Sequence, residues 1–235
     1  MSNNLHAWPI ICIGGLALGL LVALAWRLAG RFLTLPCPSW LAWLLENPFN
    51  SEANARLAVQ RLGLQPGMHV LDAGCGPGRL AVPIARALGP QGEVTALDIQ
   101  PAMLERARRR AAAARVENIR FVHAGLGEGK LESDRYDRAL LVTVLGEIPR
   151  REAALRELFA ALKPGGVLSV TELIYDPHFQ SRRTVLRLAA AVGFRELAFF
   201  GNGLAFTLNL EKPVNPIRVG SGADHPGSGT HAILF

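Results

Sequence analysis

The sequence is poor in cysteine, and its few thiols lie far apart. Only three of the 235 residues are cysteine, at positions 12, 37 and 75. They form no C-x-x-C pair and no cluster with histidine, which argues against a structural zinc site, and we expect no metal. The spacing also disfavours a disulfide scaffold and favours a reducing compartment. A chain of this length can instead bury one sizeable hydrophobic core.

Aromatic residues are scarce as well, at 7% of the chain. No basic run is interleaved with them, as a stacking platform for nucleic acid would require, so we expect no nucleic-acid partner. The formal net charge is nevertheless +6. This excess is compatible with an ordinary solvated surface or with attraction to anionic lipid headgroups.

Charge is absent from a long stretch near the N-terminus. Residues 7–26 carry no charged side chain, and about 20 such residues are enough for a helix to cross a bilayer. A cleaved signal peptide would have Lys or Arg before the apolar run, whereas the first basic residue here is Arg27. The pattern predicts a single transmembrane anchor over residues 1–32, with the rest of the chain on the cytoplasmic side. A helix buried in the protein core is the alternative. Gly15 and Gly19 form a GxxxG pair, which is compatible with a homodimer through this helix.

Residues 33–50 are rich in Trp and Pro. Prolines interrupt any continuing helix, and a short apolar segment with Trp40 and Trp43 follows them. We predict an interfacial linker that lies flat on the membrane or covers a substrate entrance. Simple packing against the folded domain is an equally good interpretation.

Strand and helix patterns alternate along residues 51–212. Apolar runs predict strands at 67–74, 93–99, 119–124, 138–144, 167–173, 194–201 and 204–210, with helices between most of them. This alternation predicts an α/β fold whose parallel sheet is covered by helices on both faces. Residues 213–235 are rich in Pro, Gly and Ser and predict a flexible tail.

The turn after the first of these strands reads D-x-G-x-G-x-G, from Asp72 to Gly78. A dinucleotide fingerprint needs its third glycine where this chain has Arg79, and the Lys-Ser/Thr pair of a P-loop is missing. A carboxylate before the loop would repel a pyrophosphate, but it suits a cationic amino-acid group. Asp98, at the end of the second strand, can accept hydrogen bonds from both hydroxyls of a ribose. Both strands end at the edge where such sheets bind ligands, so we predict a ligand with a ribose and an ammonium group.

Four successive segments resemble the motifs of class I S-adenosylmethionine-dependent methyltransferases: VLDAGCGPG, VTALDIQPAMLERAR, YDRALLVTVLGEIP and LFAALKPGGVLSVTE. The resemblance covers about Leu64 to Lys212 and is closest to the branch that methylates quinones and other lipophilic small molecules. It implies a Rossmann-like, seven-stranded, mostly parallel sheet with a reversed last strand. It also implies S-adenosyl-L-methionine as the cofactor.

The resemblance assigns seven cofactor-binding residues: Asp72, Gly74, Gly76, Gly78, Asp98, Ile99 and Thr143. The first four would contact the methionine moiety and the ribose, Asp98 the ribose hydroxyls, Ile99 the adenine, and Thr143 the region of the transferring methyl. Two structural alternatives stay open: Gly78 could serve merely to permit close helix packing, and Asp98 could cap the turn before Pro101. Many relatives have an acidic residue for the adenine after the third strand. This chain has HAGLGEG there, so the adenine would be bound by the backbone of Gly125 and Leu126 or by the side chain of Glu128.

A catalytic base is needed only if the methyl acceptor must lose a proton. The candidates on loops at the same sheet edge are Glu147, Tyr175 and His178, together with Glu172 and Asp176. Asp176-Pro177 also spells an ordinary turn, and Glu147 could simply cap the next helix. No NPPY-like segment follows the fourth strand, which argues against methylation of adenine or of a glutamine amide.

The predicted anchor narrows the substrate, because a soluble metabolite does not require a tethered enzyme. The leading hypothesis is methyl transfer to a membrane-associated lipid or lipophilic small molecule, either quinone-like or a phospholipid headgroup. Three alternatives remain: a protein lysine methyltransferase at the membrane, a non-catalytic cofactor-binding membrane module, and a nicotinamide-dependent reductase. The displaced third glycine disfavours the reductase.

Overall fold

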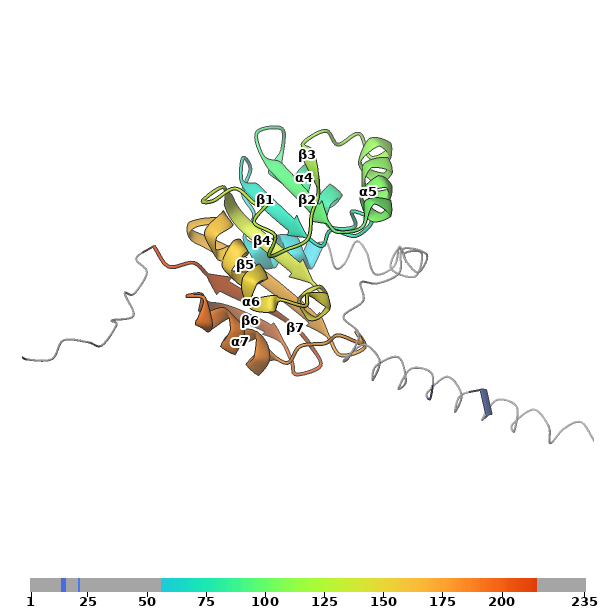
Figure 1. Ribbon diagram of the computed structural model, residues 1–235. Coiled ribbons are helices and arrows are strands. Elements are labelled where there is room, and N and C mark those ends of the chain that lie inside the picture. The colour runs from blue at the N-terminus through green and yellow to red at the C-terminus, as the bar shows by residue number, and fades with distance from the viewer. Residues whose placement is uncertain (1–13, 16–20, 22–55, 215–235) are drawn as a thin grey trace, which may run out of the picture.

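The computed structural model describes residues 14, 15, 21 and 56–214 (Figure 1). The predicted linker lies outside these residues. So does the predicted anchor apart from three positions, and the predicted tail apart from its first two residues. Within the described residues, no helix is long and apolar enough to cross a membrane.

A seven-stranded sheet forms the centre of the domain. Its strands are β1 (His69–Ala73), β2 (Glu93–Asp98), β3 (Ile119–His123), β4 (Tyr136–Val142), β5 (Leu162–Leu173), β6 (Arg195–Gly201) and β7 (Ala205–Glu211). They lie in the order β3-β2-β1-β4-β5-β7-β6. The pairs from β3 to β5 are parallel, whereas β7 is antiparallel to both β5 and β6. The predicted seven-stranded, mostly parallel sheet with one reversed strand is therefore confirmed.

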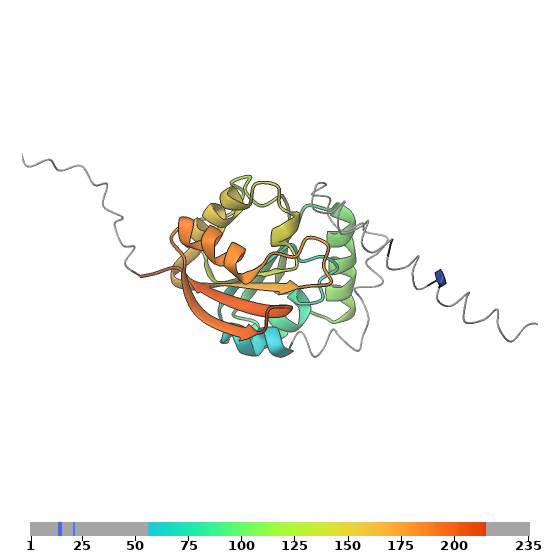
Figure 2. The same ribbon diagram turned by 90° about the horizontal axis from the view of Figure 1, so that it is seen from below.

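Helices cover both faces of the sheet, as predicted. They are α4 (Ala81–Leu88), α5 (Pro101–Ala113), α6 (Arg151–Ala161) and α7 (Arg182–Ala191), and residues 56–62 are also helical. Apolar side chains of residues 56–62, α4 and α5 form one core with the sheet, and those of α6 and α7 form another. Figure 2 shows residues 56–62 and α7 on opposite sides of the strands. The two cores explain why β1 reads as a continuous apolar run, because both of its faces are buried.

One strand begins earlier than the sequence predicts. This strand was predicted over residues 167–173, but β5 already begins at Leu162, which is paired with Tyr136 of β4, and so includes the K-P-G-G turn at residues 163–166. Lys212 draws the turn into the sheet, since its backbone N–H donates to the Gly166 carbonyl over 2.9 Å and its carbonyl accepts from the Gly165 N–H over 2.7 Å. A pairing with a residue nearly fifty positions away overrides the local turn signal.

Candidate functional site

The glycine turn after β1 curls toward the end of β2. The backbone N–H groups of Gly74 and Cys75 both donate to the Leu97 carbonyl, over 2.8 and 3.0 Å. Gly74 and Gly76 have φ of +76° and +52°, a region that glycine enters without steric cost. A Cβ on Gly74 would lie 2.5 Å from Cγ2 of Val144, whereas one on Gly76 would meet nothing within 4 Å. Gly76 therefore exposes bare backbone to open space.

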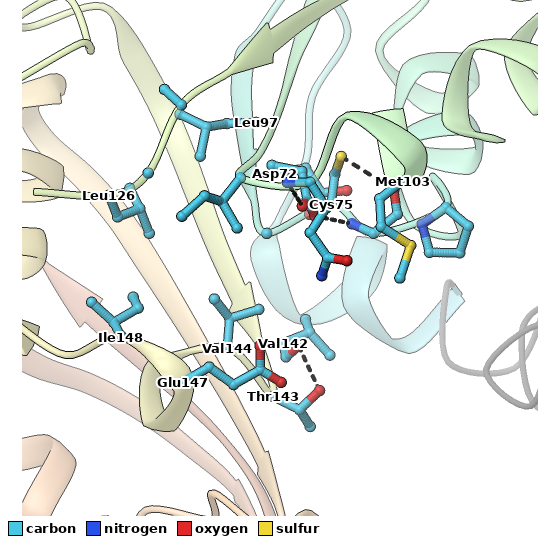
Figure 3. Close-up of a pocket in the computed structure, with 18 of the residues that line it drawn as sticks. Asp72, Cys75, Leu97, Met103, Leu126, Val142, Thr143, Val144, Glu147 and Ile148 are labelled. Atoms are coloured by element: carbon cyan, nitrogen blue, oxygen red, sulfur yellow. Dashed lines mark hydrogen bonds between the residues drawn. The ribbon is translucent and has the colours of Figure 1, made fainter. Parts of the chain in front are cut away.

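That open space belongs to a cavity of about 370 Å³ at the carboxyl ends of β1, β2 and β4. Seven of the predicted site residues line it: Asp72, Gly74, Gly76, Asp98, Ile99, Thr143 and Glu147. Figure 3 shows Asp72 and Cys75 on one side and Glu147 and Ile148 on the other. The cavity is at the edge that sheet topology predicts for a ligand, beside the reversal of strand order between β1 and β4.

Gly78 is not among the residues that line the cavity. Its φ is +77°, and a Cβ there would lie 3.0 Å from Cβ and 3.1 Å from Cα of Ala107 in α5. The missing side chain lets α5 approach the glycine turn closely. The structure thus places Gly78 as the packing alternative describes.

Asp98, at the end of β2, holds the glycine turn in place. Its carboxylate accepts hydrogen bonds from the backbone N–H of Gly76 over 2.9 Å and from that of Gln100 over 2.8 Å. The second contact holds the turn before Pro101, so the capping alternative also describes this residue. Burial raises the pKa of Asp98, and the two N–H groups oppose that rise. Each carboxylate oxygen keeps a second lone pair for a ligand hydroxyl.

Asp72 is the least satisfied group in the site. Its side chain is buried, and Oδ2 has no hydrogen-bond partner in the described structure. Burial raises its pKa to about 7, with the negative charge of Asp98 adding to the rise, while Arg79 and the Ala81 N–H oppose it. An unpaired buried carboxylate oxygen costs free energy that a cationic ligand would recover.

The loop between β3 and β4 forms the far end of the cavity. Gly125, Leu126 and Glu128 line it, and a Cβ on Gly125 would lie 2.6 Å from Oε1 of Glu128. The Glu128 carboxylate therefore folds back over Gly125. Glu157 of α6 holds this loop from behind, because its carboxylate accepts from three backbone N–H groups, those of residues 127, 130 and 131. No local sequence pattern indicates this role for Glu157, which lies in α6.

The loop after β4 forms the third wall. Thr143 has φ of +56°, unusual for a β-branched residue, and its N–H donates to the Thr171 carbonyl over 2.9 Å. The short 3-10 helix η2 (Leu145–Glu147) follows and carries Glu147 into the cavity lining. Arg151 clamps η2, since its guanidinium donates to the carbonyls of Leu145 and Gly146 over 3.1 and 2.8 Å.

Of the three predicted catalytic residues, Glu147 alone lines the cavity. Tyr175 is 79% exposed, on the loop after β5. His178 lies behind η2, with its backbone carbonyl packed against Gly146 and its ring Nδ1 3.8 Å from Oδ1 of Asp176. The structure therefore brings neither Tyr175 nor His178 to the cavity, because the chain turns away from it after β5.

Glu172 is a second buried acid, behind the same wall. It is 1% exposed, its Oε2 accepts from the Gln180 N–H over 2.9 Å, and its Oε1 has no partner in the described structure. Burial raises its pKa to about 8, and the charges of Asp176 and Glu147 add to this rise. Glu172 is therefore largely protonated at neutral pH. No group of three His, Cys, Asp or Glu residues within 56–214 is arranged to hold a metal ion.

Sequence comparison relates part of this domain to known proteins. A profile described as a methyltransferase domain matches residues 70–166. Demethylmenaquinone methyltransferase from Staphylococcus aureus is 33% identical over 114 residues, which are 48% of this chain and 46% of that protein. The chain thus spans about half the length of the curated relatives it matches.

Solved structures agree with the fold. A SAM-dependent methyltransferase from Aquifex aeolicus superposes with a TM-score of 0.69 at 20% identity, over 75% of this chain and 99% of that one. The [4+2]-cyclase SpnF does so with a TM-score of 0.62 at 19% identity, over 69% and 81%. These likenesses confirm the fold. Since one neighbour is named for a cyclisation, the fold alone does not determine the reaction.

Proposed function

We propose that this chain, whose residues 70–166 match a methyltransferase-domain profile, is a class I S-adenosylmethionine-dependent methyltransferase that methylates a lipophilic acceptor held in a membrane. The observation that carries the proposal is the buried, unpartnered Oδ2 of Asp72 in a cavity that Asp98 also lines. Two carboxylates at neighbouring strand ends suit a ligand that carries both positive charge and a ribose.

The residues present fit this cofactor. Asp72 would accept from the methionine ammonium, which satisfies Oδ2 and compensates the charges of both acids. Gly76 would let the backbone approach the ligand, because nothing lies within 4 Å of the position of its missing Cβ. Asp98 is already oriented by two N–H groups and would bind the ribose hydroxyls.

The adenine end would be held by the loop that follows β3. Glu128 takes the place of the acidic residue that many relatives have earlier in this loop, and its carboxylate lies against Gly125. Ile99 would pack on the ring from the other side, since it lines the same end of the cavity. Glu157 keeps the loop in place through its three backbone contacts.

When bound, the cofactor supplies a methyl group on a positively charged sulfur. The chain's own residues must then position the acceptor in line with that methyl, and alignment provides much of the rate. Glu147 is the acid on the opposite wall, and we assign it the proton that a phenol or an activated carbon must lose. Val144, Ile148 and Pro149 contribute apolar surface to that wall, which suits a quinone-like or lipid acceptor. The name of the Staphylococcus relative, a demethylmenaquinone methyltransferase, supports such an acceptor.

The predicted anchor over residues 1–32 completes the proposal. It would hold the domain on the cytoplasmic side of a membrane in which a lipophilic acceptor dissolves, and Gly15 and Gly19 would allow two copies to pair. The uncharged residues 7–26 support this arrangement. Deletion of residues 1–30 should release the domain from sedimented membranes, and a truncated protein that still sediments would remove the anchor from the proposal.

The decisive experiment uses the full chain, a methyl donor with a radioactive methyl group, and native membrane extract. We expect the label in an organic-soluble product, and Asp98→Asn should lose most of it in samples that circular dichroism shows to be folded. Label in polypeptide would instead indicate a protein methyltransferase. Cofactor binding without any labelled product would indicate a non-catalytic module, and preferential binding of a nicotinamide dinucleotide would indicate a reductase.

A further inference from the structure

Large apolar side chains are exposed along the carboxyl edge of the sheet, where the cavity also lies. Ile99 follows β2, Tyr175 follows β5, and Leu204 lies in the hairpin between β6 and β7; they are 55%, 79% and 61% exposed. All three loops are at the carboxyl edge of the sheet, because β6 runs parallel to β5. An isolated exposed apolar residue is ordinary, but several along the edge of the sheet that holds the cavity indicate an interaction surface.

Tyr175 and Leu204 belong to one rigid unit. The N–H of Ile174 donates to the Leu204 carbonyl over 2.7 Å, which extends the pairing of β5 with β7 beyond the strand ends. Asn202 fixes the hairpin, since its side-chain oxygen accepts from the N–H groups of Leu204 and Ala205 over 2.9 and 3.1 Å. The two apolar side chains are therefore displayed on a framework that is bonded in place.

This unit is continuous with the cavity wall. The loop that begins at Tyr175 returns along η2, where the His178 carbonyl packs against Gly146. The next residue, Glu147, lines the cavity. Ile99 lines the cavity from the opposite side, at the end of β2. Along this edge, the ends of β1 and β4, which the cavity adjoins, thus lie between Ile99 on one side and the pair Tyr175 and Leu204 on the other.

Two exposed arginines lie at the same edge as these apolar residues, together with one exposed acid of the cavity lining, Glu128. Arg150 is exposed and lines the cavity, and Arg183 is exposed in the first turn of α7, which also begins at this edge. Glu152, the exposed acid at the start of α6, pairs with Arg156 at 3.1 Å. Arginines beside apolar side chains and a tyrosine, whose ring favours an interface between apolar and aqueous phases, are complementary to anionic lipid headgroups.

We propose that this edge, formed by Ile99, Arg150, Tyr175, Arg183 and Leu204, is a membrane-docking surface that lies on an anionic bilayer, so that the cavity opens directly onto the lipid. The inference deepens the proposed function, because a lipophilic acceptor could then enter the cavity without crossing water. A protein partner would need a continuous, complementary patch of about 800 Å² on this side. A fluid bilayer can instead accommodate separate apolar side chains around an opening.

The test measures insertion with the full chain bound to vesicles of phosphatidylcholine and phosphatidylglycerol. In a background with Cys12→Ser, Cys37→Ser and Cys75→Ala, an environment-sensitive dye is placed at Tyr175→Cys or Leu204→Cys. The matched control is Glu117→Cys, an exposed position before β3 at the opposite edge of the sheet. We expect blue-shifted emission at 175 and 204, with quenching by lipids labelled about 5–10 Å below the headgroups, and no shift at 117.

A tether at the N-terminus would bring all three dyes near the membrane but would insert none of them. Equal, water-like emission at the three positions, or insertion at 117, would overturn the docking surface. Wild-type protein gives an independent reading: amide hydrogen exchange at 174–176 and 202–205 should slow on vesicles, more so when phosphatidylglycerol is present. Unchanged exchange there would count against the surface in the same way.

Insertion is measured without methyl donor or acceptor, so it can be separated from the proposed function. Dyes that insert while no membrane component is methylated would uphold the docking surface and remove the proposed reaction. Methylation of a membrane acceptor while the dyes stay in water would uphold the reaction and overturn the docking surface.

Discussion

The protonation of Asp72 should govern cofactor affinity between pH 5.5 and 7.5. Burial raises the pKa of this carboxyl to about 7, so both protonation states are populated in the free protein at neutral pH. The cationic ligand can pair only with the ionised form. Binding should therefore lower the pKa of Asp72 and release a proton, and affinity should rise as the pH increases through 7.

The size of the effect follows from the fraction of ionised Asp72. With a pKa of about 7 that fraction is roughly 3% at pH 5.5 and 76% at pH 7.5, so the apparent dissociation constant should be about 25-fold larger at pH 5.5. Asp98 acts in the same direction, because burial also raises its pKa. At pH 6 binding should release about one proton from Asp72.

Titration calorimetry in two buffers of different ionisation enthalpy measures both quantities. The matched variant is Asp72→Asn, which keeps the shape of the side chain but cannot ionise. It should bind the cofactor more weakly at pH 7.5, by about 1.5–3 kcal/mol, and lose most of the pH dependence and proton release. The ligand's own ammonium titrates near pH 8 and affects both proteins equally. If wild type and Asp72→Asn show parallel pH profiles, Asp72 does not pair with the ligand cation.

Three further predictions concern the walls of the site. Gly74→Ala should lower the free energy of unfolding by about 1–3 kcal/mol in denaturant titrations, because its Cβ would meet Val144 at 2.5 Å. Gly76→Ala lacks this clash and should cost less, about 1 kcal/mol for an alanine at φ of +52°, while it weakens cofactor binding. Equal stability losses would contradict this. Glu157→Gln should lower the free energy of unfolding by about 1–3 kcal/mol and speed amide hydrogen exchange in residues 125–131, because a side-chain amide cannot accept all three N–H groups. Unaltered exchange would show that Glu157 does not stabilise this loop. The pKa of Glu172 is about 8 in the folded protein and ordinarily 4.5, so its contribution to the free energy of unfolding declines as the pH rises from 4.5 to 8. Glu172→Gln should make the decline of the free energy of unfolding with pH shallower. An identical slope in both proteins would refute the raised pKa of Glu172.

The cofactor half of the site, meaning the residues proposed to bind the cofactor, could be predicted from the sequence because these residues lie close together along the chain. Asp72, Gly74 and Gly76 lie within five residues, and the turn they form follows from glycine's access to positive φ. Asp98 belongs to the next strand, and parallel pairing of β1 with β2 places Ala73 beside Leu97 at the shared edge. A strand-helix-strand pattern is sufficient to infer that juxtaposition.

The acceptor half of the site, formed by η2 and the loop after β5, could be predicted only in part, because the residues that position it are distant in the sequence. Tyr175 and His178 follow a strand at the correct edge, but the direction of their loop depends on contacts with Gly146 and Gln180 that no local pattern encodes. Arg151 and Glu157 support two walls from within a helix, and both look like ordinary solvated charges in the sequence.

This division has a physical consequence for how the chain could acquire specificity. The cofactor half uses backbone geometry and buried charge, which few substitutions can alter without loss of stability. The acceptor half rests on η2, which Arg151 clamps, and on the loop after β5, which the buried Glu172 holds through Gln180; the contact of the His178 carbonyl with Gly146 joins the two. The neighbour named as a cyclase has the same fold with a different reaction in its name, as expected if chemistry changes at such loops while the sheet is kept. Substitutions at Glu147 or Ile148 should therefore alter the acceptor preference of the proposed reaction while they leave cofactor affinity nearly unchanged. Ile148→Ala tests this expectation when its activity on a panel of acceptors and its affinity for the cofactor are both compared with those of the wild type.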